Sequence, residues 1–203
     1  MDVKTQIVEK SLQMFMRFGI KSVSMDDISQ ELGISKKTLY QYVADKKELV
    51  RLSLQHHLES DSEVCSSVME STENAIQQLL DLARHLAMHF KELNPSTIYD
   101  IQKYYPSCWK LFHEHREGFI LNQVSRNLER GIKSGLYRKE INPEMVSRIY
   151  ISLIDASVNL QTFPSKLFNQ VDVYMQIMAY HLHAIMSDKG REYYEIHKKT
   201  LLT

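Results

Sequence analysis

The stretch Met25-Asp-Asp-Ile-Ser-Gln-Glu-Leu-Gly-Ile-Ser-Lys-Lys-Thr-Leu-Tyr-Gln-Tyr-Val43 decides the fold of the N-terminal region. It follows Ser24, which forms an S-x-x-D capping signal with Asp27: the serine hydroxyl satisfies a backbone N–H, and the acid reaches back to the serine. The pattern predicts a short helix that ends at Gly33. Ser35 then caps a second short helix over residues 36–42. Two helices joined by so tight a turn are typical of a helix-turn-helix.

The residues on either side of this motif continue the helical pattern. Apolar residues from Val3 to Met16 recur at the spacing of one helix face, and Gly19 is placed to end that helix. Downstream, residues 45–48 repeat a capping signal and start a fourth helix, which runs on through Leu58 without a Gly- or Pro-rich linker. The sequence therefore predicts a small helical domain joined to the rest of the chain by a continuous, lever-like helix.

Positive charge is concentrated in the same region. The whole chain is neutral, with 25 basic and 25 acidic residues, yet residues 35–47 hold four lysines against Asp45 alone, a net charge of +3. A basic cluster on the second helix of such a motif is where contacts to phosphates and base edges are made. The alternative is that these lysines only solvate a surface, but their place on a turn-and-cap pattern favours DNA binding.

Composition excludes several other classes of protein. The 203 residues are 43% apolar, too many for a disordered chain, and only 6 Gly and 4 Pro punctuate them, which favours helices over a many-stranded sheet. Zero net charge argues against an all-over basic coat. The isolated Cys65 and Cys108 suggest no disulfide framework, and the sequence shows neither a secretory signal nor a bilayer-spanning stretch. We expect an all-α, cytoplasmic protein.

The motif strongly resembles the N-terminal domain of TetR/AcrR-family transcriptional regulators. The resemblance covers about residues 5–50, where the order of Gly, Ser, Thr-Leu-Tyr and Lys-Glu-Leu between residues 33 and 49 fits throughout. It implies an all-α protein with an N-terminal three-helix DNA-binding domain over residues 1–48. A larger helical ligand-binding and dimerisation domain is implied over residues 49–203.

The resemblance also implies a set of DNA contacts, on the second helix of the motif and at flanking positions that usually touch the DNA backbone. The chemistry agrees, because a lysine can donate to guanine and Gln41 suits adenine. Asp26 and Asp27 depart from a basic surface, and we interpret Asp27 as a cap rather than a contact. The candidate DNA-binding residues are Ser24, Lys36, Lys37, Thr38, Tyr40, Gln41, Tyr42 and Lys46.

The remaining residues predict further helices, over about 75–90, 98–104, 106–134, 143–160 and 171–186. The last two are apolar on more than one face, so one face would pack on the chain's own core and another on a partner. The alternative is that both helices are buried within one subunit. The resemblance implies a homodimer through these last two long helices, which would present two recognition helices to a pseudo-palindromic DNA site.

Aromatic residues gather in the second part of the chain, and ligand pockets are mostly apolar with a few placed polar groups. An aromatic stripe is more often core than ligand site, so both interpretations stay open. The candidate ligand-binding residues are His89, Tyr105, Trp109 and Phe112. The effector would be a small molecule that the sequence does not identify.

Nine histidines raise the question of an enzyme or a metal site. His85 and His89 stand four residues apart and share a helix face, as zinc-binding pairs do, but no glutamate follows His85 and no third ligand is fixed by spacing. No G-x-S-x-G, P-loop or dinucleotide motif occurs. We therefore predict no catalytic residue, no metal, no cofactor and no enzymatic activity.

These patterns and the family resemblance together favour a ligand-responsive, DNA-binding regulator. The resemblance implies a repressor that leaves its operator when a small molecule binds the C-terminal domain. Two alternatives stay open. One is an enzyme or a metal-binding helical protein that carries the motif, and metal analysis of the purified protein tests the metal-binding part. The other is a protein-interaction module whose motif binds protein instead of DNA. Steeply salt-dependent binding to duplex DNA would count against that alternative, because counterion release is the mark of phosphate contact.

Overall fold

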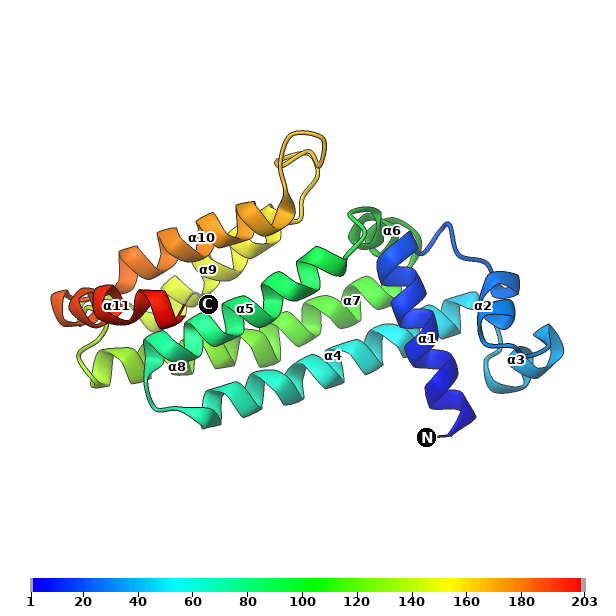
Figure 1. Cartoon of the computed structure of the whole chain (residues 1–203), viewed down its shortest axis with the longest axis horizontal. Coiled ribbons are helices and arrows are strands. Elements are labelled where there is room, and N and C mark those ends of the chain that lie inside the picture. Colours follow the sequence, from blue (N-terminus) through cyan, green and yellow to red (C-terminus); the bar gives the residue numbers. More distant parts are fainter. Residues whose placement is uncertain (1, 202–203) are drawn as a thin grey trace. The chain divides into compact units, whose positions relative to one another are not determined.

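The computed structural model describes residues 2–201, and their regular structure is helical apart from one isolated antiparallel bridge between Tyr137 and Met186 (Figure 1). The all-α prediction is therefore confirmed. In chain order the helices are α1 (Val3–Phe18), α2 (Met25–Glu31), α3 (Lys36–Tyr42), α4 (Lys46–Ser71), α5 (Ala75–Glu92), α6 (Ser96–Tyr104), α7 (Pro106–His115), the π-helix η1 (Arg116–Ile120), α8 (Leu121–Lys133), α9 (Pro143–Ser157), α10 (Gln170–Ile185) and α11 (Asp188–Leu201).

The predicted caps begin the helices of the motif. The Ser24 hydroxyl oxygen accepts the Asp27 N–H at 3.1 Å, and the Asp27 carboxylate accepts the Ser24 N–H at 2.7 Å, so the capping box of α2 is complete. Ser35 caps α3 by accepting the Thr38 N–H at 3.0 Å. Gly33 separates the two helices with a φ of 65°, a left-handed conformation that glycine adopts without steric cost.

Two stretches differ from the sequence prediction. The expected helix over 106–134 is divided into α7, the π-helix η1 and α8, because five residues from Arg116 adopt wider turns. Helix α11 has no counterpart among the helices predicted from the sequence. This helix is rich in charged residues and holds few apolar ones, so it does not stand out as an amphipathic helix in the sequence.

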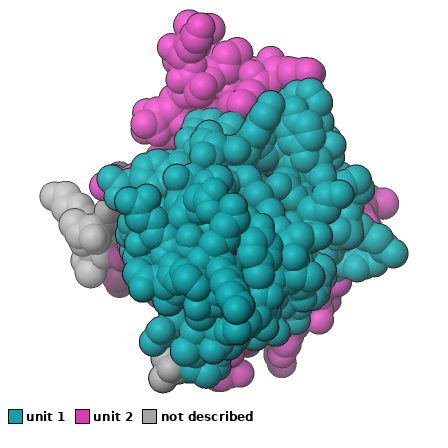
Figure 2. All heavy atoms as spheres, turned by 90° about the vertical axis from the view of Figure 1, so that its right-hand side faces the viewer, with its two compact units in different colours: residues 1–62, 92–115 teal, residues 63–91, 116–203 magenta. Residues whose placement is uncertain are grey.

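The chain divides into two compact units, coloured teal and magenta in Figure 2. Unit 1 comprises residues 1–62 and 92–115, which hold α1–α3, most of α4, α6 and α7. Its core gathers one face of each motif helix, and Ile28 and Leu39 are completely buried. Other large buried members are Ile7, Phe15, Ile20, Leu49, Leu54 and Leu58. Leu39 therefore anchors the inner face of α3 in the core of unit 1, and the opposite face of α3 is exposed to solvent.

Unit 2 comprises residues 63–91 and 116–203 and has its own core. Within it α9 and α10 lie side by side as an antiparallel pair (Figure 1). Large buried side chains come from α5, α8, α10 and the segment after α8, namely Ile76, Leu79, Leu128, Tyr137, Tyr174, Met178, Leu182 and Ile185. Packing is tight at Gly131, where an added Cβ would overlap the ring of Tyr137.

Candidate nucleic-acid interface

The exposed face of α3 and the two segments beside it carry every candidate DNA contact within unit 1. Two of the candidates, Thr38 and Lys46, are half-buried. The exposed candidates are Ser24, Lys36, Lys37, Tyr40, Gln41 and Tyr42. Because α3 is seven residues long and Leu39 anchors it, the exposed side chains are presented by a fixed backbone. This arrangement suits insertion of a short helix into a groove.

Lys46 does not present a free ammonium group in this structure. Its Nζ donates to the carbonyl oxygen of Ile20 at 2.6 Å, which ties the start of α4 to the connection between α1 and α2. Burial lowers the pKa of Lys46, and the carboxylates of Asp100 and Asp27 act in the opposite direction. The residue therefore has a structural partner within unit 1, whatever it contacts on DNA.

Lys36 has a carboxylate partner that the sequence pattern does not predict. Its Nζ lies 2.8 Å from Oδ1 and 3.0 Å from Oδ2 of Asp26, so the ammonium contacts both oxygens. The hydrogen bond and the charge of Asp26 raise the pKa of Lys36. The two residues are ten positions apart on different helices, and no helix-face spacing predicts such a pair. Asp27, in contrast, acts as the cap that the sequence predicts.

The end of α1 is held by the segment that leads into α6. The Asn94 N–H donates to the Met16 carbonyl at 2.6 Å, and the Thr97 hydroxyl donates to the Phe15 carbonyl at 3.0 Å. The Lys21 N–H donates to the Asp100 carboxylate at 2.9 Å. We call these three hydrogen bonds the α1–α6 clasp. The sequence signalled Asn94 only as a helix stop, because its partner lies 78 residues away.

Gly19 is required where the clasp closes. Its φ is 82°, and a Cβ at this position would lie 2.5 Å from the Ser96 hydroxyl oxygen. Glycine is therefore favoured twice, by the backbone conformation and by the close approach of α6. The sequence predicted the first reason, since Gly19 ends α1, but not the second.

The candidate ligand-binding aromatics belong to unit 1 and pack partly on its core. Tyr105, Trp109 and Phe112 are half-buried against that core, and the rings of Trp109 and Phe112 stack with centroids 5.8 Å apart. The edge of the His113 ring meets Trp109, with centroids 4.4 Å apart. These contacts give the aromatics a packing role in unit 1, beside any role in binding.

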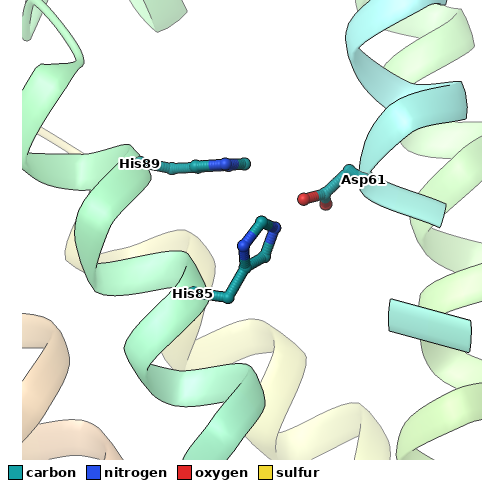
Figure 3. Close-up of side chains that lie close together, drawn as sticks. All are labelled: Asp61, His85 and His89. Atoms are coloured by element: carbon teal, nitrogen blue, oxygen red, sulfur yellow. The ribbon is translucent and has the colours of Figure 1, made fainter. Parts of the chain in front are cut away.

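His89, the fourth candidate, lies on α5 in unit 2. Figure 3 shows His85 and His89 on successive turns of this helix, and their ring centroids lie 4.2 Å apart in an edge-to-face arrangement. Asp61, the third side chain labelled there, is carried by α4 and belongs to unit 1. The predicted placement of the two histidines on one helix face is confirmed, and both are half-buried.

Unit 2 buries polar side chains that sequence reasoning missed. The ring of His181 stacks on Tyr150 with centroids 4.2 Å apart, and the Nε2 atom of His181 has no hydrogen-bond partner. Burial lowers the pKa of His181 to about 4, so the ring is neutral at pH 7. Arg116 is also buried, where it pairs with Asp155 and donates to the Ile151 carbonyl at 3.2 Å. Neither residue has a local sequence signature.

The helix pair α9 and α10 leaves large apolar side chains exposed. Met145 is 65% exposed, Ile149 is 59% exposed, and Tyr180 is 71% exposed. All three lie on the two helices that the sequence predicts as a dimer interface. Exposed apolar area of this kind is typical of a surface that another protein covers.

Residues 7–52 match a protein family described as bacterial regulatory proteins, tetR family. The match spans α1–α3 and the first turns of α4, which are the helices that carry the candidate DNA contacts. Residues 7–52 therefore form a TetR-family helix-turn-helix domain, and the chain is similar to TetR-family transcriptional regulators. This family is a class of DNA-binding regulators rather than of enzymes, and its members act as dimers. No helix in the part of the chain that the structure describes is long and apolar enough to cross a membrane.

Other regulators resemble the chain over most of its length. The HTH-type transcriptional regulator YvaF of Bacillus subtilis is 22% identical over 153 residues, 74% of this chain and 78% of YvaF. A putative regulator from Saccharomonospora viridis, solved in complex with choline, has a TM-score of 0.75 at 18% identity and covers 91% of this chain and 97% of its own. FadR from Bacillus subtilis, solved in complex with stearoyl-CoA, has a TM-score of 0.65 at 16% identity. The matched region covers 88% of this chain and 97% of the FadR chain. This likeness shows that the TetR-family fold extends beyond the matched residues.

Proposed function

We propose that this TetR-family regulator is a repressor: its dimer binds a pseudo-palindromic operator and leaves it when a small molecule binds the C-terminal domain. The observation that carries the proposal is the exposed face of α3, held from below by the buried Leu39 and placed within the stretch that matches the family. We retain residues 1–48 as the DNA-binding domain and residues 49–203 as the effector and dimerisation domain. A chromosomal target places the protein in the cytoplasm.

Direct DNA contacts come from α3 and its flanks. The exposed Lys37, Tyr40 and Gln41 can reach base edges or phosphates from one short helix, and Lys36 and Tyr42 stand at its two ends. Lysine and glutamine side chains donate to guanine and adenine respectively, while hydroxyl groups position the protein on phosphates. Ser24, Thr38 and Lys46 have partners within unit 1, so we assign them backbone contacts rather than base readout.

A gel-shift with duplex DNA from beside the protein's own gene tests this assignment. The double change Lys36→Ala and Lys37→Ala should weaken binding by tenfold or more, because it removes two positive charges from the face that meets phosphates. Lys166→Ala is the control, since Lys166 is an exposed lysine in the loop before α10. Equal losses in the two proteins would overturn the assignment of α3 as the recognition helix.

Dimerisation would use the exposed apolar surface of α9 and α10. A two-fold axis would set the two recognition helices about 34–36 Å apart, or a multiple of that distance, to read two half-sites. Ile149→Asp should shift the protein from dimer to monomer in analytical ultracentrifugation, because a charge cannot be buried there without a partner. Leu167→Asp, at a residue 77% exposed in the loop before α10, is the control and should stay dimeric.

Effector binding can be followed through the single tryptophan of the chain. Trp109 is half-buried beside Phe112. The effector contacts that we propose remain His89, Tyr105, Trp109 and Phe112. Two similar regulators were solved with choline and with stearoyl-CoA, so these compounds are the first probes. An effector should change Trp109 fluorescence and weaken duplex binding over the same concentration range, as linkage requires. A probe that changes the fluorescence alone is not the effector.

The α1–α6 clasp supports a route from the effector to the recognition helix. It ties α6 to the end of α1, and α1 packs in the same core as α3. A ligand that moved α6 would therefore act directly on the motif. Thr97→Val removes one bond of the clasp at nearly constant volume. It should reduce the effector-induced loss of operator affinity more than it changes operator affinity itself.

A further inference from the structure

The strongest unassigned feature of the candidate DNA-binding face is a carboxylate. Asp26 lies in the first turn of α2, and its side chain is 70% exposed, yet it holds the ammonium of Lys36 at 2.8 and 3.0 Å. Capping does not account for it, because Asp27 completes the capping box of α2. A negative charge on a surface that meets phosphates weakens binding to every DNA sequence, so its presence there calls for a separate explanation.

Stability does not supply that explanation. An exposed pair such as Lys36 and Asp26 adds little to the stability of the fold, because both charges are well solvated when apart. An acid in the first turn also interacts favourably with the helix dipole, but at an exposed position this contribution to stability is small as well. Either gain could be obtained at an exposed helix start far from DNA. The pair is instead placed between the start of α2 and the start of the recognition helix.

We propose that Asp26 is a positioning residue that sharpens operator specificity by holding Lys36 in place and away from indiscriminate phosphate contact. This inference rests on the proposed function as a DNA-binding regulator. With both carboxylate oxygens engaged, the ammonium of Lys36 has one preferred position at the start of α3. A free lysine would pair with whichever phosphate lay within reach and would bind all sequences more tightly.

On the operator the balance is different. A correctly placed guanine offers the ammonium two acceptors, and a cytosine amine can donate to the carboxylate itself. On the operator, the Lys36–Asp26 ion pair can be kept or exchanged for contacts to bases with little loss of binding free energy. On other sequences the carboxylate only repels phosphates. Asp26 therefore lowers non-operator affinity more than operator affinity, and specificity is the ratio of the two.

Asp26→Asn tests the inference in the full chain, since it removes the charge and keeps the shape. Affinity is measured by fluorescence anisotropy on two duplexes, the DNA from beside the protein's own gene and a shuffled duplex of the same length and composition. We expect binding to the shuffled duplex to tighten several-fold, with a steeper salt dependence of about one phosphate per protomer, and the affinity ratio to fall. Asp188→Asn is the matched control, because Asp188 is an exposed acid in the first turn of α11.

A double-mutant cycle shows whether Asp26 acts through Lys36. In a Lys36→Gln background, Asp26→Asn should change the affinity ratio by less than half as much as it does in the original chain, because the ammonium it positions is gone. An unchanged ratio in Asp26→Asn, weaker binding to both duplexes, or a full effect without Lys36 would each overturn the inference. If the original chain binds neither duplex in a salt-dependent way, the proposed function fails instead. Thermal melting of both variants confirms that they are folded.

Discussion

The helix-turn-helix and unit 2 use polar side chains in opposite ways. In the motif, Ser24 and Ser35 are exposed and bond residues three positions away. In unit 2, Tyr137 is buried and donates to the carbonyl of Ala75, which is 62 residues away. The side-chain amide of the buried Asn127 donates to Ala75 and Gln78, which are 52 and 49 residues away. Local bonds specify a small structure whose outer face is free for DNA. Long-range buried bonds specify one packing arrangement, and their partners can change together as sequences diverge.

The largest effect is expected beneath the recognition helix, where the motif depends on burial as unit 2 does. Leu39→Ala should lower the free energy of unfolding by about 2–5 kcal/mol, because Leu39 is completely buried and its loss leaves a cavity. Urea unfolding followed by circular dichroism measures this. Gln41→Ala, two positions on and exposed, is the control: its stability should stay within about 0.5 kcal/mol while duplex binding weakens. Similar stability losses in the two variants would show that α3 is not divided into a buried and an exposed face.

Acid should act on unit 2 through His181. Its pKa of about 4 in the folded chain lies below the ordinary value, so the unfolded chain takes up the proton first as pH falls. The contribution of His181 to the free energy of unfolding is fully present above pH 6.5 and is lost as the pH falls from 6.5 to 4. Between pH 7 and pH 5, the loss amounts to about 2 kcal/mol. His181→Phe keeps the stacking on Tyr150 and removes the titration. Its stability should therefore decline less over this range than that of the original chain, and parallel declines would contradict the assignment.

The close packing in unit 2 is tested by replacing each of two glycines, Gly131 and Gly118, with alanine. Gly131→Ala should lower the free energy of unfolding by about 1–3 kcal/mol, because the new methyl group overlaps the buried ring of Tyr137. Gly118→Ala meets no atom within 4 Å and should be neutral or slightly stabilising. Thermal melting of the two variants gives the comparison. A stable Gly131→Ala protein would mean that Tyr137 can move at little cost.

The smallest effect separates the two roles of Ser24. Ser24→Ala should lower stability by about 1 kcal/mol, because the first turn of α2 loses its cap. Ser24→Asp restores a cap but adds a negative charge on the face proposed to meet phosphates. It should recover the stability and still bind the duplex more weakly than the original chain. Full recovery of both properties would remove Ser24 from the DNA contacts.

The same contrast explains what the sequence could predict. The caps at Ser24 and Ser35, the end of α1 at Gly19 and the course of α4 all follow from residues a few positions apart, and the structure confirms them. The Lys36–Asp26 pair and the α1–α6 clasp join residues far apart in sequence, so only the folded chain brings them together. The five residues of the π-helix η1 have no sequence signature of their own, and α11 holds too few apolar residues to stand out as a helix. The candidate contacts to DNA and effector remain predictions.

The salt dependence of duplex binding tests the central claim most directly. Binding of the full chain to labelled DNA from beside its own gene is measured by anisotropy between about 50 and 200 mM KCl, the range over which phosphate contacts change affinity by orders of magnitude. We predict that the logarithm of Kd rises linearly with the logarithm of the salt concentration, and that Lys36→Ala with Lys37→Ala makes the slope shallower. Duplex binding whose Kd does not change with salt concentration would contradict the claim that the exposed face of α3 contacts DNA. An equal slope of log Kd against log salt concentration in the double variant would contradict it as well.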